Sequence, residues 1–220
     1  DQKQYPLVSI ALIPLFVLFY LGMYMSLRYK YSRITWRGIR GRLAGSPLDY
    51  AWISIFHTII NVITVGLLIP YSDIRTKGYI INNSYFGSQK AEFNGKASKI
   101  FFTHIITWLL FIPTIGFSRF WYRAKLARYI YESTAIGNVR LEGGQTAFNM
   151  YRLLIGNILI ILFTFGLGAP FIVQRNMKYF CRTLTIIGEF NTSEIKQSEE
   201  KIKKSGEGIE GIIGDSSIGW

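Results

Sequence analysis

The residues most able to do chemistry in this chain are polar groups placed inside long apolar stretches. They are His57, Asn61, His104 and Asn157. Polar side chains inside a membrane are costly, and they often line a path for a solute or a proton. They also serve as interhelical hydrogen bonds that hold a bundle together. His57 and Asn61 are four residues apart on one helical face, so this pair is the one placed to line a shared cavity.

No pattern typical of an enzyme or a metal centre is written in the sequence. One cysteine, Cys181, and two histidines are too few and too scattered for a structural zinc site. No Gly-x-Ser-x-Gly nucleophile motif, His-Glu-x-x-His motif or phosphate-binding loop occurs. Gly143-Gly144 resembles a phosphate cradle, but a turn ahead of the last apolar stretch explains the pair better. We expect a protein that is not an enzyme and that needs no metal or cofactor.

The composition indicates a membrane protein. Of the 220 residues, half are hydrophobic and 17% are charged, and the formal net charge is +12. Soluble domains carry about a quarter of their residues as charge. Four windows lack any charged residue, and each is long enough to cross a hydrocarbon core about 30 Å thick. The first window is too long for the apolar part of a signal peptide, so we expect it to be retained. The predicted apolar spans are about 5–26, 51–71, 100–117 and 153–173.

A period of fifty residues organises these windows. Tyrosine recurs at this spacing at Tyr29, Tyr79, Tyr129 and Tyr179. Each apolar window from the second onward contains Thr-x-Gly, followed in two of the three copies by Pro. Glycine loosens a helix and proline removes a backbone donor, so the pattern predicts a kink or a helix end. The predicted hinge positions are Gly66, Pro70, Gly116, Gly166 and Pro170.

Basic and aromatic residues follow each window. Residues 119–131 place Arg and Lys among Trp and Tyr at helical spacing, which is typical of a helix at the headgroup level. Such cations attract anionic lipid, and they equally act as a topology signal. Alternating runs at 90–93 and 138–142 predict small strand hairpins. The cations predicted to contact anionic lipid are Arg37, Arg40, Arg42, Arg75, Arg123, Lys125, Arg128, Arg175 and Lys178.

The distribution of charge separates two regions. Residues 1–188 form the predicted membrane domain, with cations in short clusters beside the apolar windows. This clustering argues against nucleic acid as a partner, because a nucleic-acid-binding domain presents one basic stripe or patch. Residues 189–220 hold seven acids and four lysines and are rich in glycine. We expect them to form a flexible, charged C-terminal tail.

Several strings resemble the YjgN-like family of bacterial inner-membrane proteins. They include Thr64-Val-Gly-Leu-Leu-Ile-Pro70, Arg119-Phe-Trp-Tyr-Arg-Ala-Lys125 and Gly206-Glu-Gly-Ile209, and the resemblance runs from about Tyr29 to the C-terminus. It implies a multi-pass protein of the bacterial inner membrane. Because the activity of that family is uncharacterised, the resemblance implies no site residues.

Together these features predict an all-α integral membrane protein with about four transmembrane helices in four degenerate repeats. Two topologies stay open: four full crossings, or windows that enter the membrane and return to the same side. Two functions also stay open. One is transport or permeation of a small solute or lipid, and the other is a non-enzymatic scaffold that binds anionic lipid or a partner protein. The expected partners are the lipid bilayer and either a second copy of the chain or another membrane protein.

Overall fold

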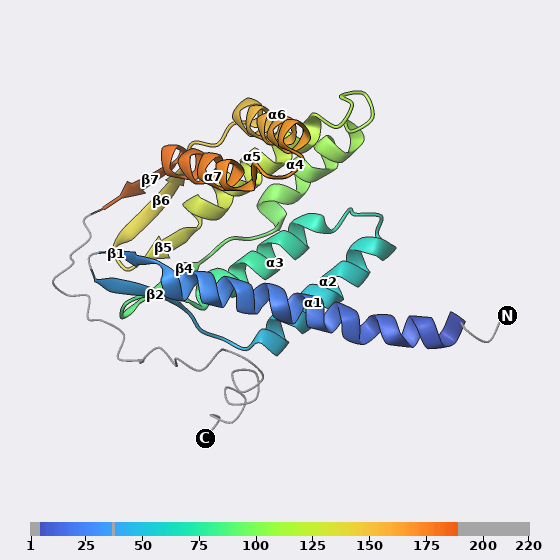
Figure 1. Ribbon diagram of the computed structural model, residues 1–220, viewed down its shortest axis with the longest axis horizontal. Helices are drawn as coiled ribbons and strands as arrows, with labels where there is room; N and C mark the ends of the chain where they lie inside the picture. Colours follow the sequence, from blue (N-terminus) through green and yellow to red (C-terminus); the bar gives the residue numbers. More distant parts are fainter. Residues whose placement is uncertain (1–4, 37, 189–220) are drawn as a thin grey trace, which may run out of the picture. The chain divides into compact units, whose positions relative to one another are not determined.

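The computed structural model describes residues 5–36 and 38–188, and the chain divides into two compact units with a boundary between Ala91 and Glu92. The predicted C-terminal tail lies outside the described residues. The elements of the first unit (Figure 1) are α1 (Tyr5–Arg33), β1 (Thr35–Trp36), β2 (Ile39–Leu43), α2 (Pro47–Ile63), α3 (Ile69–Asn82) and β3 (Ser84–Phe86), with β4 (Gln89–Phe93) at the boundary.

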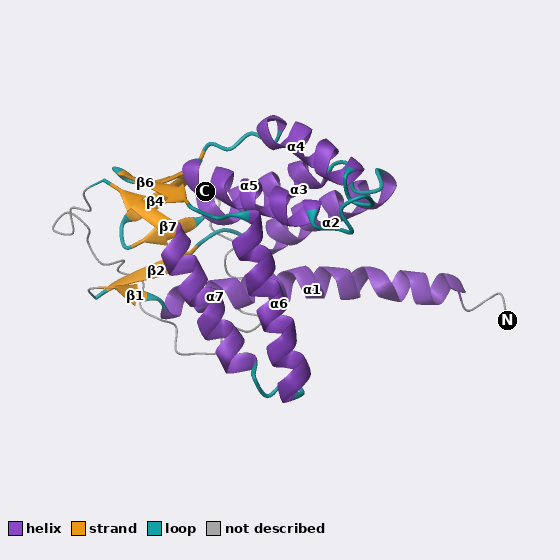
Figure 2. Ribbon diagram, turned by 90° about the horizontal axis from the view of Figure 1, so that it is seen from above, coloured by secondary structure: helices purple, strands orange, loops and turns teal. Residues whose placement is uncertain are grey.

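The second unit contains two pairs of helices, and each pair is followed by a strand. Figure 2 separates its helices, in purple, from its strands, in orange. Its elements are α4 (Ser98–Leu109), α5 (Ser118–Glu132), β5 (Thr134–Ile136), β6 (Val139–Gly143), α6 (Ala147–Thr164), α7 (Ala169–Thr183) and β7 (Leu184–Ile187).

The fifty-residue period of the sequence is a period of the structure. Strands β2, β4 and β6 begin at positions 39, 89 and 139, and strands β3, β5 and β7 begin at 84, 134 and 184. Between each such pair of strands the chain forms two antiparallel helices joined at one end. We call α2–α3, α4–α5 and α6–α7 the helical hairpins. Each repeat therefore consists of a strand, a helical hairpin and a second strand.

The prediction of an all-α fold is wrong, because the described part of the chain contains antiparallel strands as well as helices. Strands β3 and β4 pair with Phe86 opposite Gln89, which leaves a two-residue turn at 87–88. Strands β5 and β6 pair with Ile136 opposite Val139 in the same way. Two-residue turns that start with Gly suit strand hairpins, because Gly adopts the required positive φ. The small strand hairpins predicted at 90–93 and 138–142 are confirmed.

The prediction of four transmembrane helices is also wrong. The predicted spans 51–71 and 153–173 each contain the end of one helix, a turn and the start of the next helix, and the predicted span 100–117 contains most of α4 and the turn that ends just before α5. Within the described residues, one helix, α6, is long and apolar enough to cross a membrane. Hydropathy alone cannot separate a segment that crosses from one that reverses, since both place an apolar run between two polar ends.

The reversal is made by the Thr-x-Gly motif. In each helical hairpin, the residue between Thr and Gly and the Gly itself both adopt positive φ. The Gly amide then donates to the carbonyl five residues earlier, as Gly66 N does to Asn61 O at 2.7 Å. This is the geometry of a left-handed helix cap, and two consecutive left-handed residues turn the chain back. Pro70 and Pro170 lie in the first turn of the return helices α3 and α7, where a missing amide hydrogen costs little.

The repeated tyrosine fastens the other end of each hairpin. Tyr79 Oη accepts a hydrogen bond from Ser46 N and donates one to Ser46 O, both at 2.9 Å, just before α2. Tyr129 Oη accepts from Lys96 N at 2.6 Å, at the equivalent place before α4. Both pairs are 33 residues apart. Tyr179 occupies the third position, where its hydroxyl is buried with no hydrogen-bond partner in the described chain, and burial raises its pKa.

Candidate functional site

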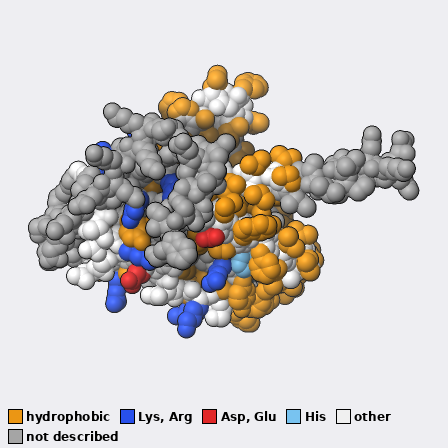
Figure 3. All heavy atoms as spheres, turned by 90° about the horizontal axis from the view of Figure 1, so that it is seen from below, with side chains coloured by type: hydrophobic (Ala, Val, Ile, Leu, Met, Phe, Trp, Pro, Cys, Tyr) orange, Lys and Arg blue, Asp and Glu red, His pale blue; other side chains and the backbone are white. Residues whose placement is uncertain are grey.

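The turns that join the helices expose large apolar side chains. We call Val65, Ile115 and Phe165, the left-handed residues of the three turns, the tip residues. Their side chains are 73%, 96% and 95% exposed. Other exposed apolar residues surround them: Val62, Ile63, Leu67, Phe111, Ile112, Phe163 and Leu167. Figure 3 shows many hydrophobic side chains exposed on one face.

The tip residues are poorly suited to their backbone conformation. Their φ angles are 51°, 50° and 49°, in a region that costs an L-residue about 1–2 kcal/mol. Asparagine or glycine occupies this region more readily, and a β-branched residue such as Val65 or Ile115 is rare there. Neither backbone geometry nor packing within the described chain accounts for these residue types. They suit a turn that is buried in an apolar medium outside the chain.

The threonine of each turn forms hydrogen bonds with the backbone, so that few backbone polar groups lack a hydrogen-bond partner. Thr64, Thr114 and Thr164 each donate from Oγ1 to the carbonyl four residues earlier, at 2.6–2.8 Å. Thr114 Oγ1 also accepts from Ser118 N at 3.1 Å, and Thr164 Oγ1 from Gly168 N at 2.8 Å. A loop that enters hydrocarbon must satisfy its own backbone in this way, because no water is present to do so.

The spacing of charges sets how far a tip can enter a membrane. From Phe165, the first cation back along α6 is Arg152, and the first along α7 is Arg175. At 1.5 Å per residue, Arg152 lies about 18 Å along α6 from its end at Thr164, and Arg175 lies about 9 Å along α7 from its start at Ala169. One half of a hydrocarbon core is about 15 Å thick. The uncharged part of the α6–α7 hairpin is therefore comparable with one leaflet on the α6 side and shorter on the α7 side, where Arg175 limits how deep the tip can lie.

The predicted lipid contacts lie on the return helices and on β2. Arg75, Arg123, Lys125 and Lys178 are exposed on α3, α5 and α7. Others are partly buried: Arg128, Arg175, Arg40 and Arg42. The Arg42 guanidinium lies 4.6 Å from the centre of the Tyr85 ring. Arg37 lies outside the described residues.

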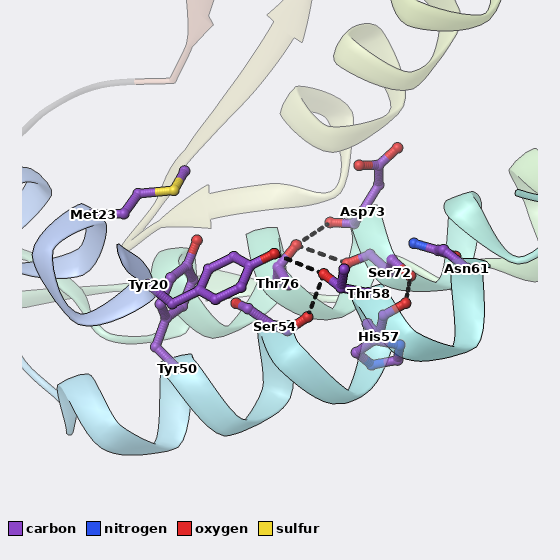
Figure 4. A pocket seen from close by; sticks show the side chains of 10 residues that line it. All are labelled: Tyr20, Met23, Tyr50, Ser54, His57, Thr58, Asn61, Ser72, Asp73 and Thr76. Atoms are coloured by element: carbon purple, nitrogen blue, oxygen red, sulfur yellow. Dashed lines mark hydrogen bonds between the residues drawn. The ribbon is translucent and has the colours of Figure 1, made fainter. Parts of the chain in front are cut away.

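A polar cavity of about 180 Å³ lies in the first unit among α1, α2 and α3. His57 and Asn61 both line it, together with Asp73 and hydroxyl groups (Figure 4). Tyr20 Oη and Thr58 Oγ1 share a hydrogen bond of 2.7 Å that links α1 to α2. The cavity therefore brings two of the four predicted polar residues into one space.

The other two predicted polar residues stay apart from this cavity. His104 is fully buried on α4, with its ring 4.8 Å from the Tyr122 ring of α5. Asn157 Nδ2 donates to Asn176 Oδ1 at 2.9 Å, which joins α6 to α7. Both residues tie the two helices of one hairpin together. No cluster of three metal-ligating side chains occurs within residues 5–36 and 38–188.

Sequence reasoning missed Tyr20 and Thr76 as members of the cavity. It placed Asp73 only at the edge of an apolar window. The available signal was that Asp73 is the one acid between Asp49 and Glu92. The helix reversal that brings α3 back against α2 was not predicted, so no spacing rule connected Asp73 with His57.

Comparison with known families shows which family this chain belongs to. A family model described as a bacterial protein of unknown function (DUF898) matches residues 2–118 and again residues 105–212. The chain belongs to this bacterial family. The two tandem matches agree with the internal repeat, and the resemblance inferred from the sequence strings is confirmed. No curated protein and no solved structure is significantly similar to the DUF898 chain.

Proposed function

We propose that this DUF898 protein is a membrane-embedded scaffold that enters one leaflet through its hairpin tips and binds anionic lipid through its return helices. The tip residues carry the proposal. Val65, Ile115 and Phe165 combine a strained backbone with nearly complete exposure. In water nothing offsets the backbone strain of these residues. In hydrocarbon, burial of each side chain offsets it by about 1.5–3 kcal/mol.

Helical hairpins keep their two ends on one side of the membrane. This topology places every basic segment on the same surface, which for a bacterial inner membrane is the cytoplasmic surface. The 24 residues without charge between Lys3 and Arg28 give α1 the length to anchor the N-terminal part. The exposed cations of α3, α5 and α7 then lie where each contributes about 1 kcal/mol of attraction to an anionic surface.

Depth-dependent fluorescence quenching tests this topology. In a Cys181→Ser background, single cysteines replace Val65, Ile115 or Phe165 and carry an environment-sensitive fluorophore. In vesicles, we expect quenching by nitroxides on the acyl chains and protection from aqueous iodide. Ile186 is the matched control, because it is exposed on β7 at the far end of α7 from the tip. A label there should respond to iodide, and iodide access at the tips would contradict the proposal.

Transport of a small solute is a second candidate, supported by the polar cavity that contains His57 and Asn61. Its test is flux of small polar solutes in vesicles that contain the full chain. If the cavity forms part of a path, His57→Leu with Asn61→Leu abolishes the flux of the parent protein while its unfolding transition is retained. Absence of any flux from the parent protein would favour the scaffold.

A further inference from the structure

The Arg175 side chain of α7 lies against the backbone of the neighbouring helix α6, and the two helices run side by side in Figures 1 and 2. A Cβ atom added to Gly156 would overlap Arg175 Nη2 and would lie 2.8 Å from Cζ and 3.0 Å from Nη1. The guanidinium therefore occupies the space that a larger residue at position 156 would fill. Arg175 is partly buried there, whereas the cations at the equivalent positions of the other helical hairpins, Arg75 and Lys125, are exposed.

The backbone of α6 does not require glycine at position 156. Gly156 lies in the interior of the helix, where glycine is unfavourable, and its φ is not in the left-handed region. The equivalent positions of the first and second helical hairpins hold Phe56 and Ile106. The three atoms nearest to an added Cβ all belong to the Arg175 guanidinium. Room for that guanidinium is therefore the structural reason for this glycine.

A hydrogen bond between the next residue of each helix fixes the position of Arg175 over Gly156. Asn157 Nδ2 of α6 donates to Asn176 Oδ1 of α7 at 2.9 Å. The two helices cannot slide past each other without breaking this bond. The guanidinium is therefore held at one level of the α6–α7 hairpin.

No acid accompanies the cations of this hairpin. Residues 143–188 contain no Asp or Glu, whereas α6 and α7 carry Arg152, Arg175, Lys178 and Arg182. Within residues 5–36 and 38–188, the Arg175 guanidinium makes neither an ion pair nor a hydrogen bond. A guanidinium presents its N–H donors in a rigid fork that matches two oxygens of a phosphate or carboxylate group. The position over Gly156 thus offers a fixed fork of donors and a positive charge to an anion.

We propose that Arg175, held over Gly156, binds a phosphate group, carried either by a phospholipid headgroup or by a free phosphate anion. Two N–H groups of the guanidinium donate to two phosphate oxygens, and the anion neutralises the charge. The headgroup form of the ligand rests on the proposed function, whereas the phosphate chemistry rests on the α6–α7 hairpin alone. If the tip lies in hydrocarbon, Arg175 is the cation of α7 nearest to it, about 9 Å from the start of the helix. The phosphates of lipid headgroups are then the first anions that it meets.

Calorimetric titration of the full chain in micelles of an uncharged maltoside detergent tests the proposal without a bilayer. The probes are dihexanoylphosphatidylglycerol, inorganic phosphate and dihexanoylglycerol, which lacks the phosphate. At about 0.5 M salt, diffuse attraction between the basic chain and an anion is largely screened. We expect both phosphate compounds to bind, and dihexanoylglycerol to bind about tenfold more weakly than the phosphate lipid or not at all. Tighter binding of the lipid identifies the headgroup as the source, and equal or tighter binding of inorganic phosphate identifies the free anion. Equal affinity for dihexanoylglycerol and the phosphate lipid, or no binding of either phosphate compound, would overturn the proposal.

Three variants separate the positioned guanidinium from positive charge in general. Arg175→Gln should weaken phosphate binding about ten- to hundredfold, the range of a charge-assisted hydrogen bond. Gly156→Ala keeps every charge but displaces the guanidinium, and it should weaken binding about tenfold. The unfolding transition of that variant should be kept, because alanine favours the helix and the displaced atoms are the end of a flexible side chain. Lys178→Gln removes an exposed cation from the same helix and should leave binding unchanged at this salt concentration.

Equal losses in Arg175→Gln and Lys178→Gln, or unchanged phosphate binding in Gly156→Ala, would refute the proposed site. If Arg175→Gln does not fold, Gly156→Ala alone decides. Failure of the proposed function gives a different result: the tip labels would be open to iodide, while phosphate binding in micelles would still depend on Arg175. Failure of the site alone would leave the tips protected and phosphate binding insensitive to Arg175.

Discussion

Replacing a tip residue with asparagine should change membrane binding and folding stability in opposite directions. Ile115 is 96% exposed, so its side chain makes almost no contact within the chain that a substitution can remove. Asparagine tolerates the φ of 50° better than isoleucine, which should stabilise the folded chain in detergent by about 1 kcal/mol. The same change removes an apolar side chain worth about 1.5–3 kcal/mol when it is buried in hydrocarbon.

The free energy of burying the Ile115 side chain in hydrocarbon corresponds to a measurable change in how strongly the chain partitions into vesicles. At about 1.4 kcal/mol for each factor of ten, Ile115→Asn should weaken binding to vesicles about ten- to 150-fold. Flotation of the full chain with vesicles, at lipid concentrations where the parent is half bound, measures this ratio. Helix α1 contributes equally to parent and variant, so the ratio isolates the tip. Ile186→Asn on β7 makes the same chemical change at another exposed position and should leave partitioning unchanged.

The signs of the changes in folding stability and in vesicle binding show whether the tip enters hydrocarbon. Urea unfolding in detergent gives the stability of the folded chain, and flotation gives its affinity for the vesicle. A variant that becomes more stable and binds less tightly supports entry of the tip into hydrocarbon. If Ile115→Asn lowers the free energy of unfolding and leaves flotation unchanged, the tip packs against protein, and the reasoning from exposure and strain fails.

The repeated tyrosines and the cations of α5 give two further predictions. Tyr79→Phe and Tyr129→Phe should each lower the free energy of unfolding by about 1–2 kcal/mol, because a backbone amide loses its acceptor, whereas Tyr179→Phe should be neutral or stabilising. Chemical denaturation of the three variants checks this order, and equal losses would contradict it. Arg123→Gln with Lys125→Gln should weaken binding to anionic vesicles about thirtyfold, at about 1 kcal/mol per cation, and should not affect binding to zwitterionic vesicles. Salt titration of flotation checks the effect, which should disappear as ionic strength rises.

Parts of the fold could be predicted because they depend on local sequence. The fifty-residue register, the strand hairpins and the importance of the Thr-x-Gly motif follow from periodicity and from the preferences of glycine. The direction of the chain after that motif could not be derived in the same way. A glycine after an apolar helix permits either a kink or a reversal, and the choice depends on how the next helix packs against the previous one.

The candidate cavity could likewise be predicted only where it depends on local sequence. His57 and Asn61 could be paired from their spacing on one helix. The cavity that they line together with residues of α1 and with Asp73 depends on packing between segments distant in sequence. The role of Tyr79 and Tyr129 could not be predicted from the sequence alone, although each lies 33 residues after its backbone partner, Ser46 or Lys96. Asn157 forms a hydrogen bond with Asn176 of the neighbouring helix, as an interhelical hydrogen bond requires, and His104 contacts the neighbouring helix through its ring, which lies against Tyr122.

The constant spacing of the repeats also limits which insertions and deletions such a chain can accept. Equivalent strands, such as β3 and β5, begin fifty residues apart with no insertion or deletion between them. A segment excised from Ser84 to Ser133 would join Asn83 to Thr134 at an equivalent backbone position, so a strand would still follow a helix. A loss that differs from fifty residues by an odd number would turn the strand's side chains to the opposite face of the sheet. Gene duplication and deletion in this family are therefore expected to add or remove one whole helical hairpin at a time.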